Sequence, residues 1–164
     1  VVGLLFMATV GFGWAKPVPI DPRYFKNPKR GMALTALAGP VTNLLITVVM
    51  LFVYGLIIGF FGFGGAVAAF FATTALTTAY LSLSLAVFNL IPIPPMDGSK
   101  VLFSLASDET YFKLMRYERF GTILILILAV SGKLWGPLGS VTQKLFNAFL
   151  IIAQKGFELA RQIV

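Results

Sequence analysis

The sequence predicts an all-α polytopic membrane protein with a proline-rich irregular segment at membrane depth. The main observation is a run of 66 residues, from Gly31 to Met96, without one charged side chain. About 20 apolar residues already span a hydrocarbon core. The chain is also 58% hydrophobic and only 12% charged, whereas soluble domains carry about 25% charged residues.

The chain begins inside an apolar stretch, residues 1–14, which reads VVGLLFMATVGFGW. It is short for a complete span, and no basic region precedes it as in a signal peptide. We therefore expect residues 1–14 to be a partial span and the chain to be the C-terminal portion of a longer membrane protein. The connector that follows, residues 16–30, is rich in proline and carries five basic residues against Asp21. This excess predicts a cytoplasmic location.

Two complete spans are predicted over residues 32–61 and 66–90. The glycine-rich turn between them lacks Lys and Arg, which is typical of the non-cytoplasmic side. The next connector, residues 100–119, is basic again and is predicted to return to the cytoplasm.

The last third of the chain predicts two more helices. A probable span covers residues 117–135, although its apolar centre is short and reaches span length only with its flanks. Residues 141–164 place apolar side chains at helical spacing among basic ones, which predicts an amphipathic helix lying on the membrane surface. The net charge of +7 comes mostly from residues beside apolar runs. It therefore indicates contact with anionic lipid and no nucleic-acid partner.

The composition also limits the chemistry of these residues. The chain contains no cysteine and no histidine. Disulfides and thiolate chemistry are thus excluded for these residues. The commonest zinc ligand and general base are missing as well.

The segment from Asn89 to Gly98, NLIPIPPMDG, is the strongest functional signal. Its three prolines stop a helix near Leu90. Irregular backbone at membrane depth is tolerated only where protein buries it or a water-filled cavity borders it. The carboxylate of Asp97 is then a candidate for binding a metal or lining a polar path. In the alternative interpretation the segment is an interfacial turn, and Asp97 caps a helix that starts near Lys100.

Two further motifs have structural explanations of their own. In Gly39-Pro40-Val41-Thr42-Asn43, small residues allow another helix to approach closely, and Asn43 needs a hydrogen-bonding partner. The residues GWAKPVP, at 13–19, are typical of a chain leaving the membrane, with its tryptophan at the interface.

Taken together, the motifs at 13–19, 38–43 and 89–98 strongly resemble the site-2 protease family of intramembrane zinc metalloproteases, and most of all its compact bacterial branch without a PDZ domain. The resemblance extends from about residue 11 to residue 104. In that family a His-Glu-x-x-His helix supplies two zinc ligands and the general base. The resemblance implies that Asp97 is the third zinc ligand and that Asn89 steadies the substrate carbonyl or its oxyanion.

The chain departs from this pattern because it has no His-Glu-x-x-His. A truncation upstream of residue 1 explains that absence better than a pseudoprotease does. As given, the 164 residues are predicted to hold no catalytic zinc and to be inactive.

The expected function of the parent protein is hydrolysis of peptide bonds in transmembrane protein substrates, within the lipid bilayer of a bacterial plasma membrane. The rival interpretation is a non-catalytic transporter or assembly subunit that uses Asp97 to bind ions or protons. A His-Glu-x-x-His in the sequence upstream of Val1 would favour the protease.

Overall fold

The structure is a computed structural model that describes residues 8, 20–62 and 64–164. Throughout these residues every regular element is a helix, and none is a strand. The predicted all-helical class is thus confirmed. The predicted partial span 1–14 and the motif at 13–19 fall outside the described residues, apart from residue 8.

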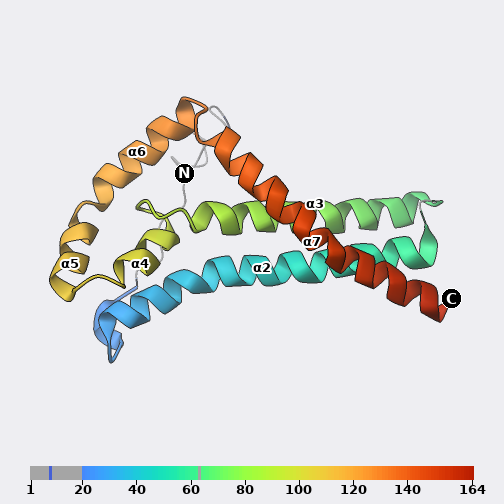
Figure 1. The fold of residues 1–164 in the computed structure, drawn as a ribbon, viewed down its shortest axis with the longest axis horizontal. Coiled ribbons are helices and arrows are strands. Elements are labelled where there is room, and N and C mark those ends of the chain that lie inside the picture. Colours follow the sequence, from blue (N-terminus) through green and yellow to red (C-terminus); the bar gives the residue numbers. More distant parts are fainter. Residues whose placement is uncertain (1–7, 9–19, 63) are drawn as a thin grey trace.

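A long helical hairpin forms the body of the molecule (Figure 1). After a short 3₁₀ turn, η1 (Pro22–Tyr24), helix α2 runs over Pro28–Phe61 and helix α3 over Ala66–Asn89. Asn27 caps α2 by accepting a hydrogen bond from the backbone N–H of Arg30 at 3.1 Å. Both helices are long and apolar enough to cross a membrane. Their bounds lie within a few residues of the predicted spans 32–61 and 66–90.

The two helices are joined by side chains at mid-length. Thr47 is fully buried, and its hydroxyl donates to the carbonyl oxygens of Asn43 at 2.9 Å and of Ala79, on the other helix, at 3.3 Å. The buried core lies beside this bond and also includes α7 (Trp135–Ile163). Its members are Leu51, Ala79, Leu83, Phe146 and Ala153.

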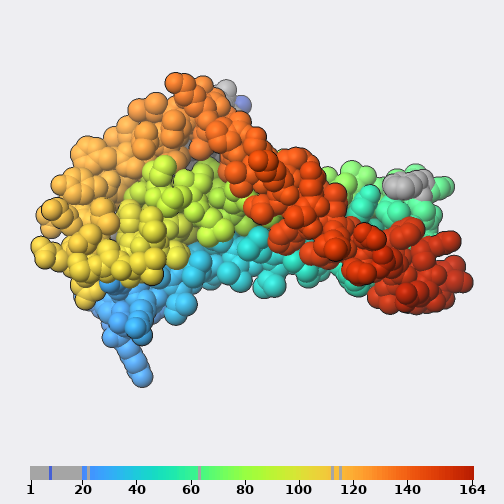
Figure 2. All heavy atoms as spheres, in the orientation of Figure 1, coloured from blue at the N-terminus to red at the C-terminus, as the bar shows by residue number. Residues whose placement is uncertain are grey.

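Helix α7 crosses the hairpin diagonally and packs against α2, with its C-terminal end near the α2–α3 turn (Figures 1 and 2). One face of α7 is buried against the rest of the protein. The buried residues of that face are Thr142, Phe146, Ala153, Gly156 and Ala160. This face meets protein, and the placement of α7 on a membrane surface stays a prediction.

The region predicted as a span over 117–135 contains a sharp bend. Helix α6 (Glu118–Val130) ends before it, and the axes of α6 and α7 differ by 86°. Gly132, with φ of 76°, lies in the turn between them, where glycine carries no steric penalty. A straight helix over 117–135 therefore does not form, and the pair resembles a broken span or a re-entrant loop.

Two short helices, α4 (Asp97–Phe103) and α5 (Asp108–Arg116), complete the fold. Together with α6 they gather at the end of the hairpin where α2 begins and α3 ends (Figure 1). Two of the sequence motifs, those at 38–43 and 89–98, lie at this end.

Candidate active site

The segment between α3 and α4 is irregular, as its prolines predict. Helix α3 ends at Asn89, and no regular element covers residues 91–96. The Pro94–Pro95 peptide is cis. One turn-forming hydrogen bond joins the N–H of Met96 to the carbonyl of Ile93 at 3.1 Å. The segment is thus followed directly by α4, whose first residue is Asp97.

Close backbone contacts hold this segment in place. Gly98 is buried, and a Cβ atom added there would overlap the carbonyl of Leu90. Gly121 of α6 approaches the carbonyl of Pro94 in the same way. The segment is therefore packed between the end of α3 and a neighbouring helix. Burial by protein is the condition under which irregular backbone is tolerated at membrane depth.

Ser99 fixes the turn into α4. It is almost fully buried, and its hydroxyl donates to the carbonyl of Met96 at 2.7 Å. The N–H of Ser99 donates to the same carbonyl at 3.1 Å. These two hydrogen bonds set the direction in which the chain leaves the proline segment, and hence the position of Asp97.

Asp97 is half-buried and does not cap a helix. Helix α4 begins at Asp97 itself, Met96 is the N-cap, and no side-chain capping hydrogen bond is present there. The alternative with Asp97 capping a helix that starts near Lys100 therefore does not match the structure. An acidic residue in a first turn is favoured by the helix dipole, which explains the earlier start. Burial raises the pKa of the Asp97 carboxyl, and the positive charge of Lys100 opposes this shift.

The motif at 38–43 meets Asp97. A Cβ atom added to Gly39 of α2 would lie 3.5 Å from the Oδ2 atom of Asp97. The carboxylate thus lies against the helix backbone at Gly39. The sequence predicts that a helix packs at Gly39. The structure identifies that helix as α4 and shows that the contact includes the candidate metal ligand.

Asn89 occupies the last position of α3, on the other side of the proline segment from Asp97. It is half-buried. Within the described ranges its side chain makes no hydrogen bond to Asp97. Its expected role toward a substrate is thus a prediction that depends on the geometry of a complex.

The described residues do not amount to a zinc site. Over these residues no group of three His, Cys, Asp or Glu side chains could hold a metal ion. Zinc sites use three or four protein ligands, and Asp97 offers only one. The donor is of a suitable type, but its partners would have to come from residues other than those described.

Sequence reasoning missed the contacts that support Asp97. Gly98, Ser99 and Gly121 shape the segment, and none of them was expected to do so. Gly121 carried a usable signal, because an isolated glycine in an apolar helix often has a packing reason. The contact with Ser99 had no comparable signal in the sequence.

Residues 56–131 match Peptidase family M50. The "Putative zinc metalloprotease YwhC" of Bacillus subtilis (strain 168) is 34% identical over 143 residues, which cover 84% of this chain and 61% of that protein. The "Putative zinc metalloprotease Rip2" of Mycobacterium tuberculosis (strain ATCC 25618 / H37Rv) is 30% identical over 161 residues, which cover 96% of this chain and 60% of that protein.

The chain spans less than two thirds of the length of these curated relatives. No solved structure matches it. The family match includes the whole of α3, the proline segment and α4. Asn89 and Asp97 therefore both lie inside the matched region.

Proposed function

We propose that the whole protein is an intramembrane zinc metalloprotease. The premise is that the chain belongs to Peptidase family M50, the site-2 protease family. Its reaction is hydrolysis of peptide bonds in transmembrane protein substrates. Its location is a bacterial plasma membrane, in keeping with the bacterial relatives and with the two helices apolar enough to span.

The state of Asp97 is the observation that carries this proposal. Within the described chain the carboxylate makes no ion pair or capping hydrogen bond, although it is half-buried between α4 and α2. Partial burial of a carboxylate that has no close ion pair is costly. In this proposal the cost is offset in the whole protein, where Asp97 is one zinc ligand. Zinc, when bound, supplies Lewis acidity toward a peptide carbonyl and toward water.

Asn89 takes a different role in the proposal. Its amide is assigned to the carbonyl oxygen of the substrate, to which it would donate a hydrogen bond. This bond would strengthen as negative charge develops on that oxygen during attack. The position at the end of α3, just before the buried proline segment, supports this assignment because the helix holds the side chain on a rigid support.

The test compares two substitutions in the full-length protein. Asp97→Ala removes a zinc ligand and should abolish both proteolysis of a transmembrane substrate and tight zinc binding. Asn89→Ala should keep its zinc and lose about 100- to 1,000-fold in rate. Zinc content and cleavage are measured on the same purified samples.

Glu109→Ala serves as the matched control for these variants. Glu109 is an exposed carboxylate of α5, so this variant should keep its zinc. Cleavage by Asp97→Ala near the wild-type rate would refute the protease assignment of this motif. Loss of zinc from Asn89→Ala would refute the role assigned to Asn89.

A further inference from the structure

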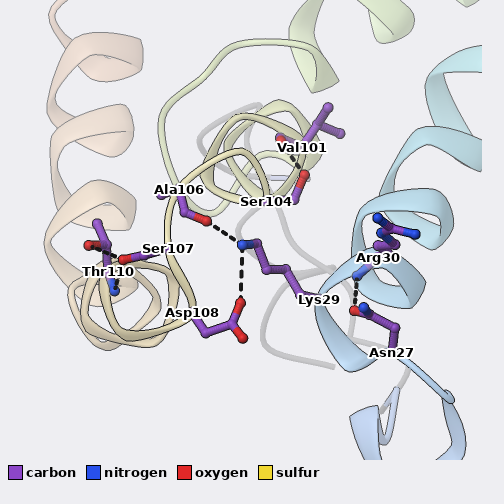
Figure 3. Close-up of polar contacts among 9 residues, drawn as sticks. All are labelled: Asn27, Lys29, Arg30, Val101, Ser104, Ala106, Ser107, Asp108 and Thr110. Carbon is purple, nitrogen blue, oxygen red and sulfur yellow. Dashed lines mark hydrogen bonds and ion pairs between the residues drawn. The ribbon is translucent and has the colours of Figure 1, made fainter.

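Lys29, in the first turn of α2, reaches across to the connector between α4 and α5 (Figure 3). Its Nζ atom donates to the carbonyl oxygen of Ala106 and lies 3.1 Å from Oδ1 of Asp108. The Lys29 side chain is 19% exposed, whereas that of Asp108 is 81% exposed. The lysine is thus the less exposed member of the ion pair, and it also donates to a main-chain oxygen. We refer to Lys29, Ala106 and Asp108 as the Lys29 clamp.

The position of Lys29 is unfavourable unless the clamp forms. The first turn of a helix carries partial positive charge, which disfavours a cation there. Helix α2 has no acidic residue in its first turn to offset this. Partial burial of the ammonium group adds a desolvation cost. The carbonyl of Ala106 supplies the main compensating contact, and the exposed carboxylate of Asp108 adds only a weak ion pair.

A continuous set of backbone hydrogen bonds connects the clamp to Asp97. The N–H of Ala106 donates to Phe103 at 3.0 Å, and the N–H of Ser104 donates to Lys100 at 3.0 Å. At the other end, Ser99 is bonded to Met96. Helix α4 and the turns after it therefore form one short rigid piece.

That rigid piece contacts α2 at both of its ends. Asp97, at its start, lies against Gly39. Ala106, at its end, accepts a hydrogen bond from Lys29. With both ends fixed to the same helix, a shift at one end tilts the piece and moves the other.

We propose that Lys29 is a positioning residue for Asp97. By holding the far end of α4 against α2, Lys29 sets where the Asp97 carboxylate lies over Gly39. For its effect on proteolysis this inference rests on the proposed function. Its geometric content is independent of the reaction. An ordinary surface ion pair would act through Asp108, whereas positioning acts chiefly through the carbonyl of Ala106.

The geometry is tested by disulfide cross-linking in the full-length protein. Gly39→Cys and Asp97→Cys are introduced together, and any cysteine outside these 164 residues is replaced, since the chain itself has none. The rate of cross-link formation under mild oxidation reports how often α4 is docked on α2. This rate is compared between the double-cysteine protein that keeps Lys29 and its variants Lys29→Met, Lys29→Arg and Asp108→Asn. The control is Lys26→Met, which changes an exposed lysine outside the clamp.

Lys29→Met is expected to slow cross-linking about tenfold or more, the ratio implied by losing one hydrogen bond to a charged group. Lys29→Arg should restore most of the rate because it keeps a charged donor. Asp108→Asn and Lys26→Met should change it less than about twofold, because exposed ion pairs contribute little. In the protein with Gly39 and Asp97 intact, Lys29→Met should lower proteolysis by about 10- to 100-fold.

An unchanged cross-linking rate in Lys29→Met would overturn the inference. Equal slowing by Asp108→Asn would overturn it too, because the group would then be a plain ion pair. If Lys29→Met does not fold, Lys29→Gln replaces it, with the same expected direction and the same contradicting result. Slower cross-linking together with a wild-type protein that cleaves no transmembrane substrate would support the positioning role and refute the protease proposal.

Discussion

Glycine brings backbones together in two regions of this molecule, with different results. Between α2 and α7, Gly55 and Gly59 face Ala153 and Ala160, and Gly156 faces the carbonyl of Phe52. Around the proline segment, Gly98 and Gly121 face the carbonyls of Leu90 and Pro94. The first region joins two regular helices. The second packs irregular backbone next to Asp97.

The difference lies in what the backbone groups do. In the α2–α7 junction almost every N–H and C=O is bonded within its own helix, so glycine there serves only close packing. In the proline segment many backbone groups have no helical partner. Glycine there decides which of them lie against neighbouring backbone. Substitutions in the first region should therefore mainly lower stability, and substitutions in the second should mainly disturb the site around Asp97.

Among the substitutions in these two regions, Gly98→Ala has the largest expected effect. The added methyl group would overlap the carbonyl of Leu90, so the start of α4 must move and carry Asp97 with it. Proteolysis by the whole protein should fall about 100-fold, the cost of a misplacement near 1 Å, while the helix content measured by circular dichroism stays close to wild type. Gly64→Ala, which adds a methyl group in open space, is the control. Full activity of Gly98→Ala would mean that the site tolerates the shift.

Gly156→Ala should lower the stability of the protein more than it disturbs the site. Its methyl group would meet the backbone of α2 and should lower stability by about 1–3 kcal/mol, measured by thermal unfolding in detergent. Gly139→Ala lies on the same helix in open space and should gain up to about 1 kcal/mol from helix propensity. If both variants unfold at the same temperature, the α2–α7 junction is not closely packed.

Thr47→Val is expected to have a smaller effect. It keeps the shape of the side chain and removes the hydrogen bond to Ala79. Hydrogen bonds between membrane helices contribute about 0.6 kcal/mol on average. A loss above about 2 kcal/mol in the same unfolding assay would show that this bond, rather than glycine packing, dominates the contact between α2 and α3.

The smallest expected value is the zinc content of residues 1–164 on their own. Over the described residues no group of three His, Cys, Asp or Glu side chains could hold a metal ion, and the sequence has no histidine. Metal analysis after purification in detergent should find far less than one zinc per chain. A stoichiometric zinc signal would contradict the incomplete ligand set assigned to these residues.

Much of the fold could be predicted because its causes are local. The uncharged run from Gly31 to Met96 and the glycine-rich turn inside it define α2 and α3. The prolines after Leu90 end α3. The bend at Gly132 was also marked by a residue that favours positive φ, but the apolar pattern around it suggested a continuous span.

The site could be predicted only in part because its contacts join distant segments. Asp97 stood out because it ends an uncharged run. Its neighbour Gly39 and the clamp residue Lys29 belong to α2, far away in the sequence, and no periodicity links them to α4. Likewise, the amphipathic pattern over 141–164 predicted a helix at a membrane surface, but it did not show that α2 covers one face of α7.

The outer face of α7 has a consequence for where this helix can lie. Polar side chains on it pair along the helix: Gln143 donates to Asn147 at 2.9 Å, Gln154 donates to Glu158 at 2.9 Å, and Lys155 lies 2.8 Å from Glu158. In water such pairs contribute only about 0.2–0.5 kcal/mol each. Next to hydrocarbon an unpaired charge costs several kcal/mol, so the pairing of Lys155 with Glu158 would matter much more there than in water. The contribution of this face to stability therefore depends on whether it meets water or lipid.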